Sequence, residues 1–262
     1  MPFTPRKVHV SLVNAPIVIG HRGAAGLIPE NTLPSFRRAY ACGVNAVELD
    51  VHWHDGALIV LHDDALDRTT NGSGPFSKLN LRALRRLDAG GGWPIPLLTE
   101  VLAELPAGVS INIELKGAET AAPVADLLTS GLLQAAGRTD DASAATGPNR
   151  SAEGPDVLVS SFDHDELCRF HARAPHIRVA PLLHEWQTDA WDLAASLGAF
   201  AINLNHRIAT PARLAEASER GLRTFLYTVN DLARARALIA AGATGVFTDY
   251  PDRITQAALL AD

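Results

Sequence analysis

Residues 21–62 read HRGAAGLIPENTLPSFRRAYACGVNAVELDVHWHDGALIVLH and decide how the rest of the chain is organised. Within this stretch, the apolar run at residues 46–51 is typical of a buried strand that also carries two acids, Glu48 and Asp50. Side chains two residues apart on a strand share a face, so the two carboxylates point the same way. Buried carboxylates are costly without a counter-charge, which a metal ion would supply.

Strand and helix patterns alternate along the whole chain. The principal strands are expected at residues 17–20, 46–51, 110–115, 157–160, 178–183, 200–203, 224–227 and 245–248, and most of them are separated by segments with helical periodicity. This alternation favours an α/β fold, a (β/α)8 TIM barrel built as a single domain over residues 1–262. A doubly wound open sheet is the weaker alternative, because its fewer strands fit eight runs poorly.

Two segments interrupt the alternation. Residues 63–96, after the second strand, are rich in Gly, Asn, Asp and Pro, and we expect a small inserted segment there with one short helix near residues 79–87. Residues 136–156 are small and polar, and we expect them to form a flexible loop.

Composition and charge restrict the classes of partner. The chain has 262 residues, a net charge of −6 and a pI near 5.9, which argues against a general nucleic-acid or acidic-membrane partner. Its sequence contains no apolar run long enough to cross a bilayer, and residues 1–16 lack the features of a signal peptide. We therefore expect a cytoplasmic protein that acts on a small molecule and has no stable membrane association.

The candidate functional residues lie at or just past the carboxyl ends of predicted strands, where barrel enzymes place their chemistry. Glu48, Asp50 and Glu114 offer oxygen ligands of the kind that Mg²⁺ or Ca²⁺ prefers. Spacing alone leaves two interpretations open: these acids bind a divalent cation, or they pair with arginines at the mouth of the barrel.

Two histidines flank Glu48 and Asp50 in sequence. His21 and His62 are suited to proton transfer near neutral pH, one to an attacking oxygen and one to a departing oxygen. Arg22 and Lys116 add positive charge at the same strand ends, which suits either a phosphate group or salt bridges to the acids. A purely structural role for both histidines is the alternative, and their position beside a carboxylate pair favours catalysis.

A series of short motifs follows in order along the chain. They are HRG (residues 21–23), PENT (29–32), ELDV (48–51), HD (62–63), LDRTTNGSG (66–74), NIELK (112–116), SSFD (160–163), YTVND (227–231) and FTDYP (247–251). As an ordered set, these motifs resemble those of the glycerophosphodiester phosphodiesterase family. The resemblance covers nearly the whole predicted barrel, and it implies a TIM barrel with an inserted segment after the second strand. It also implies that the protein hydrolyses a glycerophosphodiester to an alcohol and sn-glycerol 3-phosphate, within lipid and glycerol metabolism.

Matching motifs imply a role for each candidate residue. His21 and His62 would be the acid/base pair, and the acids Glu48, Asp50 and Glu114 would bind Mg²⁺ or Ca²⁺. Arg22 and Lys116 would contact the phosphate. Many relatives have Trp where this chain has Tyr227, so Tyr227 would form part of an altered wall of the substrate pocket. The resemblance does not identify the preferred alcohol, the physiological metal or the oligomeric state.

Two further functions compete with this interpretation. The first is a zinc-type amidohydrolase barrel, because His52-Trp53-His54 forms an H-x-H element that His184, His206 and Asp249 could complete. That arrangement expects the H-x-H after the first strand, whereas this one follows the second. The second is a non-catalytic barrel that binds glycerophosphodiesters, which retention of every acid/base and metal residue disfavours.

Overall fold

A closed parallel barrel forms the body of the protein. The structure is a computed structural model that describes residues 15–130 and 157–261. Within these ranges eight parallel strands close into a barrel because β1 pairs with both β2 and β9. The barrel strands are β1 (Ile17–Gly20), β2 (Ala46–His54), β4 (Ser110–Leu115), β5 (Val157–Ser161), β6 (Arg178–Leu183), β7 (Ala201–Asn205), β8 (Arg223–Tyr227) and β9 (Gly245–Thr248). The predicted (β/α)8 fold is confirmed.

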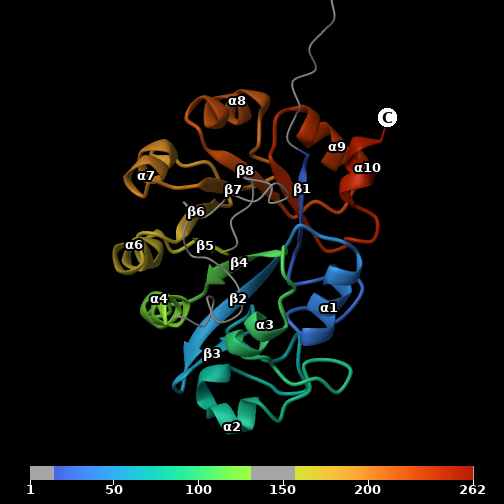
Figure 1. The fold of residues 1–262 in the computed structure, drawn as a ribbon. Coiled ribbons are helices and arrows are strands. Elements are labelled where there is room, and N and C mark those ends of the chain that lie inside the picture. The colour runs from blue at the N-terminus through green and yellow to red at the C-terminus, as the bar shows by residue number, and fades with distance from the viewer. Residues whose placement is uncertain (1–14, 131–156, 262) are drawn as a thin grey trace, which may run out of the picture.

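Helices surround the barrel on its outer side (Figure 1). They are α1 (Leu33–Ala41), α3 (Leu98–Glu104), α4 (Ala121–Thr129), α6 (His164–Arg173), α7 (Ala190–Ser196), α8 (Pro211–Glu219), α9 (Leu232–Ala240) and α10 (Gln256–Leu260). Local sequence explains several starts: Thr32 accepts a hydrogen bond from the Ser35 amide before α1, and Thr210 accepts one from the Arg213 amide before α8. The sequence analysis did not predict α10.

The barrel interior changes character along the barrel axis. One layer is apolar and consists of Ile19, Ala46, Leu158, Ala180, Ala201, Phe225 and Phe247. The rings of Phe225 and Phe247 meet edge to face, with their centroids 6.5 Å apart. Two residues further toward the carboxyl ends, Ile19 is followed by His21, just after β1, and Ala46 is followed by Glu48 on β2. The apolar layer therefore forms a floor beneath the charged groups.

The inserted segment begins as a hairpin on β2. The strand β2 continues to His54, past its predicted end, because β3 (Ala57–Val60) pairs with it antiparallel across a turn at Asp55 and Gly56. Both turn residues have positive φ, which Asp and Gly tolerate. The segment then forms a 3-10 helix η1 (Phe76–Lys78) and the short helix α2 (Leu81–Leu84).

This inserted segment has a small apolar core of its own. The core consists of Ile59, Leu61, Leu66, Phe76, Leu84, Ala89 and Ile95. The predicted helix at residues 79–87 is wrong in extent, because Asn80 accepts a hydrogen bond from the Ala83 amide and starts the helix at Leu81. Figure 1 shows β3 and α2 at one edge of the barrel, below β2. The predicted insertion after the second strand is confirmed.

Other predictions reach the limits of the described residues. Helix α4 ends at Thr129, near the end of the first described range, and the flexible loop expected at residues 136–156 lies outside the described residues. No helix in residues 15–130 and 157–261 is long and apolar enough to cross a membrane.

Candidate active site

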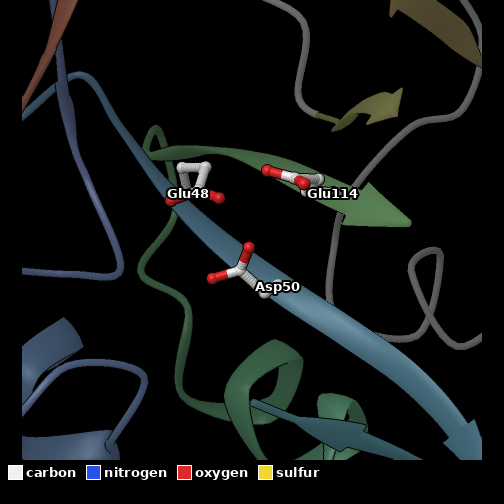
Figure 2. A group of neighbouring side chains, drawn as sticks. All are labelled: Glu48, Asp50 and Glu114. Atoms are coloured by element: carbon white, nitrogen blue, oxygen red, sulfur yellow. The ribbon is translucent and has the colours of Figure 1, made fainter. Parts of the chain in front are cut away.

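Three carboxylates meet inside the carboxyl end of the barrel. Glu48 and Asp50 lie on β2, and Glu114 lies on the neighbouring β4, where it is the Cα partner of Asp50 in the parallel ladder. Figure 2 shows the carboxylates of the two strands gathered around one space. A carboxylate oxygen of each residue lies within 4.8 Å of those of the other two, and all three side chains are buried.

This acidic cluster fits a divalent cation. All its donors are oxygen atoms, which suit Mg²⁺ or Ca²⁺ better than zinc. Asp50 Oδ1 is buried and accepts no hydrogen bond, and Lys116 Nζ lies 3.7 Å away from it. Burial and the charge of Asp50 raise the pKa of Glu114 to about 7, and burial raises the pKa of Glu48 well above its ordinary value. The raised pKa values show that Arg22 and Lys116 do not fully offset the burial and mutual repulsion of these carboxylates.

Two cations border the acidic cluster. The Arg22 amide donates to Glu48 Oε2 at 2.9 Å, and Arg22 Nε lies 3.3 Å from Asp50 Oδ2. Lys116 Nζ donates to Glu114 Oε1 at 2.9 Å. Burial alone would lower the pKa of Arg22, but the surrounding carboxylates outweigh it and raise that pKa. Salt bridges to the acids are thus present, and they place both cations beside the pocket.

Arg22 has an unusual backbone that fixes its position. Its φ is +49°, in the left-handed region that non-glycine residues seldom adopt. The Arg22 carbonyl accepts hydrogen bonds from the Ser35 hydroxyl at 2.9 Å and from the Asn31 amide at 3.1 Å. The Asn31 side chain in turn donates to Asp50 Oδ2 at 2.8 Å. Strained backbone held by several hydrogen bonds is characteristic of functional sites.

Both predicted histidines line the same pocket, and each is held by a carboxylate. His21 Nδ1 lies 2.6 Å from Asp249 Oδ1, and His62 Nδ1 lies 2.5 Å from Asp63 Oδ1. Because Nδ1 of each ring contacts a carboxylate, Nε2 is the ring nitrogen that remains available to a substrate. Burial lowers the pKa of His62, and the charge of Asp50 and the hydrogen bond with Asp63 only partly oppose this effect.

The carboxylate behind His21 is itself held in place. Asn230 donates from its side-chain amide to Asp249 Oδ2 at 2.5 Å and accepts from the Asp249 backbone amide at 2.9 Å. Burial would raise the pKa of Asp249, but its hydrogen bond and ion pair with His21 keep that pKa below its usual range. Asp249 is therefore an ionised carboxylate that fixes the His21 ring.

The pocket between the histidines has a volume of about 190 Å³. Its polar lining comes from His21, Arg22, Glu48, His62, Asn112 and Glu114, and its remaining lining comes from Phe162, Leu182, Tyr227, Thr228 and Phe247. The Tyr227 ring meets Phe162 edge to face at 5.8 Å and Phe247 at 6.4 Å. One side of the pocket is thus charged, and the other is largely aromatic.

The structure brings all eight candidate residues to one end of the barrel. Sequence reasoning assigned no role in this site to Glu30, Asp63 or Arg68, and it considered Asp249 only as a zinc ligand. Two of these residues could have been predicted from their position in the sequence, because Asp249 directly follows β9 and Asp63 directly follows His62. The contacts of Arg68 with Glu30, 38 residues away, have no signal in one sequence.

The H-x-H element does not form a metal site. His52 is buried against Phe76, and its Nε2 lies 3.3 Å from the His62 carbonyl oxygen. His54 Nε2 lies 2.6 Å from the Leu79 carbonyl oxygen, and Asp249 pairs with His21 instead. Among residues 15–130 and 157–261, the acidic cluster is the group that could hold a metal ion. The amidohydrolase alternative is therefore wrong.

Known proteins are similar to this chain over most of its length. A glycerophosphodiester phosphodiesterase of Caldanaerobacter subterraneus subsp. tengcongensis is 30% identical, with 91% of this chain and 96% of that protein covered. One of Bacillus altitudinis is 32% identical, with 90% and 95% covered. An Oleispira antarctica phosphodiesterase solved in complex with the product sn-glycerol-3-phosphate has a TM-score of 0.78 at 28% identity, with 94% and 98% covered.

The family itself follows from a direct match. The model of the glycerophosphoryl diester phosphodiesterase family matches residues 21–253, a range that begins at the first histidine of the site and includes every candidate residue. Relatives of at least 30% identity cover the same barrel. The chain belongs to the glycerophosphoryl diester phosphodiesterase family, which makes it a phosphodiester hydrolase.

Proposed function

We propose that this enzyme hydrolyses small glycerophosphodiesters to an alcohol and sn-glycerol 3-phosphate, with a divalent cation at the acidic cluster and two histidines as proton-transfer groups. One observation carries the proposal: two histidines, each held by a carboxylate through Nδ1, line a pocket that is also lined by Glu48 and Glu114 of the acidic cluster. The similarity to a phosphodiesterase solved with sn-glycerol-3-phosphate supports the choice of product.

Each part of the site has a distinct task. Arg22 and Lys116 supply positive charge for the phosphate oxygens. Bound to Glu48, Asp50 and Glu114, a divalent cation would offset the charge of the phosphate and of the attacking oxygen.

The two histidines move the protons. One accepts the proton of the attacking oxygen at Nε2, and the other donates a proton from Nε2 to the departing alkoxide, which is too basic to leave unaided at neutral pH. Asp249 and Asp63 hold the two rings in orientation and stabilise whichever ring is protonated.

The pocket favours a small diester. A cavity of about 190 Å³ is smaller than the pockets that hold drug-sized ligands, which occupy roughly 300–1,000 Å³. The aromatic side of the pocket, with Tyr227 between Phe162 and Phe247, offers apolar surface for the carbon atoms of glycerol or of the leaving alcohol. We infer that Tyr227 contacts substrate through its ring.

A direct test compares the enzyme with and without metal. Protein stripped with chelator and then supplied with Mg²⁺, Mn²⁺ or Ca²⁺ is offered several glycerophosphodiesters while released glycerol 3-phosphate is measured. We expect activity to be lost with chelator and restored by at least one cation. Full activity in the chelated enzyme would contradict the metal assignment. No release from any of the diesters under any metal would contradict the proposed substrate class and favour the non-catalytic binding barrel.

A further inference from the structure

The guanidinium of Arg68, in the inserted segment, forms hydrogen bonds with two carboxylates beside the site. Arg68 donates from Nε to Asp63 Oδ2 at 2.6 Å and from Nη2 to Asp63 Oδ1 at 3.0 Å. The same side chain donates from Nη1 to Glu30 Oε2 at 2.7 Å and from Nη2 to Glu30 Oε1 at 2.8 Å. Two bidentate pairs on one arginine define the orientation of both carboxylates, since the guanidinium is planar and rigid.

Each of these two carboxylates also contacts a residue that lines the pocket. Asp63 Oδ1 lies 2.5 Å from His62 Nδ1, and Glu30 Oε1 accepts from Arg22 Nη1 at 2.7 Å. Asp63 therefore links Arg68 to His62, and Glu30 links Arg68 to Arg22. Arg22 and His62 are otherwise on different elements, one after β1 and the other after β3.

The fold of the inserted segment holds Arg68 in this place. The Leu66 amide donates to the Gly74 carbonyl at 2.9 Å, and the Gly74 amide donates to Asp67 Oδ2 at 2.8 Å, so the chain closes a compact turn around Arg68. Leu66, two residues before Arg68, is fully buried in the apolar core of the inserted segment. The guanidinium is therefore carried by ordered backbone.

The exposure of Arg68 indicates that its ion pairs matter more for the orientation of the site residues than for the stability of the fold. Its side chain is 48% exposed, and solvent screens ion pairs at such exposure, which limits their contribution to folding. By contrast, groups that orient a ligand or proton-transfer residue change activity by roughly 10–100-fold. The bridge between His62 and Arg22 thus has its main effect on the reaction.

We propose that Arg68 is a positioning residue, which holds the His62 ring through Asp63 and the Arg22 guanidinium through Glu30, and that this is a task of the inserted segment. The proposal rests on the proposed function, because it takes His62 as a proton-transfer group and Arg22 as a phosphate contact. Arg68 itself does not line the pocket.

The first experiment compares Arg68→Gln with a matched control. Arg173 forms the same bidentate geometry with Asp126, donating from Nε at 2.5 Å and from Nη2 at 2.9 Å, is 53% exposed and lies on α6 away from the pocket. We expect Arg68→Gln to lower kcat about 10–100-fold and to raise KM, whereas Arg173→Gln changes neither. Both variants should keep Tm within about 2 °C of the parent.

A double-mutant cycle tests the route through Asp63. If Arg68 acts on His62 through Asp63, the double variant Arg68→Gln/Asp63→Asn loses less kcat than the two single losses combined, because both changes disrupt the same route. Additive losses would overturn that route. Arg68→Lys keeps the charge but cannot form bidentate hydrogen bonds with both carboxylates, so it should recover only part of kcat. Full recovery with Lys would overturn positioning by the bidentate geometry, and this variant also serves if Arg68→Gln fails to fold.

His62→Ala separates failure of this inference from failure of the proposed function. If His62→Ala keeps parental turnover, the proposed role of His62 is wrong, and the positioning role falls with it. If His62→Ala is strongly impaired while Arg68→Gln has parental kcat and KM, only the positioning role of Arg68 is overturned. A kcat loss in Arg68→Gln that the Arg173→Gln control lacks supports it.

Discussion

The two sides of the pocket differ in their chemistry, because one is charged and the other is largely aromatic. The side formed by β1, β2 and β4 carries His21 and the three buried acids Glu48, Asp50 and Glu114, and burial raises the pKa values of Glu48 and Glu114. The other side, from the strands after β4, presents rings such as Tyr227, which pack edge to face and need no counter-charge. Charged groups buried in this way reduce stability, and buried aromatic groups increase it. The comparison indicates that one side carries the groups proposed to act on the substrate, whereas the other contributes the shape and stability of the pocket.

The largest expected effect is on the charged side. His21→Ala and His62→Ala should each lower kcat by on the order of 10²–10⁴, because each removes a proton-transfer group. Metal affinity, measured by calorimetry, should change little. On a diester with a nitrophenolate leaving group, the variant that lacks the general acid should recover most of its rate, which assigns the two roles. Near-parental turnover in both variants would mean that the histidines are structural.

The aromatic side should respond through stability. Phe247 is fully buried, contacts Phe225 and Tyr227, and also belongs to the apolar floor. Phe247→Ala should therefore lower the free energy of unfolding by about 3–5 kcal/mol, the usual cost of a large cavity in a core. Urea unfolding with chelator present measures this loss. A loss below that of Glu114→Gln would contradict the division between the two sides.

A smaller effect concerns the pH dependence of the metal-free protein. The pKa of Glu114 is raised from 4.5 to about 7, so the folded state retains a proton that the unfolded chain releases. The free energy of unfolding therefore falls as pH rises through this window, and above pH 7 the penalty is complete. Glu114→Gln lacks the titrating group, so its stability relative to the parent should rise between pH 5 and 7 and then level off. Parallel pH curves for the two proteins, measured by urea unfolding in chelator, would refute the shift.

The smallest expected effect is at the rim of the aromatic side. Tyr227→Phe retains the ring that meets Phe162 and Phe247, so kcat should be unchanged and KM should stay within about threefold of the parent. Tyr227→Ala removes the ring and should raise KM further. Michaelis kinetics on one glycerophosphodiester compare the two variants. Equal KM in both would show that the ring does not contact substrate.

Elements with strong local signals could be predicted from the sequence. The start of α1 follows from Thr32 and Pro34, and the start of α8 follows from Thr210 and Pro211. The end of β2 could not be predicted, because its last residues are extended only through pairing with β3. The extent of α2 depends on the Asn80 cap and on packing of the inserted segment.

The site divides in the same way. Glu48, Asp50 and Glu114 were predicted because strand periodicity fixes their face and because parallel strands end at the same edge. The partners Asp249 and Arg68 were not, because their contacts depend on barrel closure and on the path of an irregular segment. Local physics predicts which side chains point into the barrel, and tertiary packing decides which of them touch.

The pairing of β1 with β9 also sets an order of events during synthesis of the chain. His21 and Asp249 are 228 residues apart, so at about 5–20 residues per second the ribosome adds Asp249 roughly 10–50 s after His21. Until then, β1 in the nascent chain lacks its neighbour on one side. The residues of the acidic cluster have all been translated by residue 114. The emerging protein therefore acquires its carboxylates early, and the orientation of its first histidine comes last.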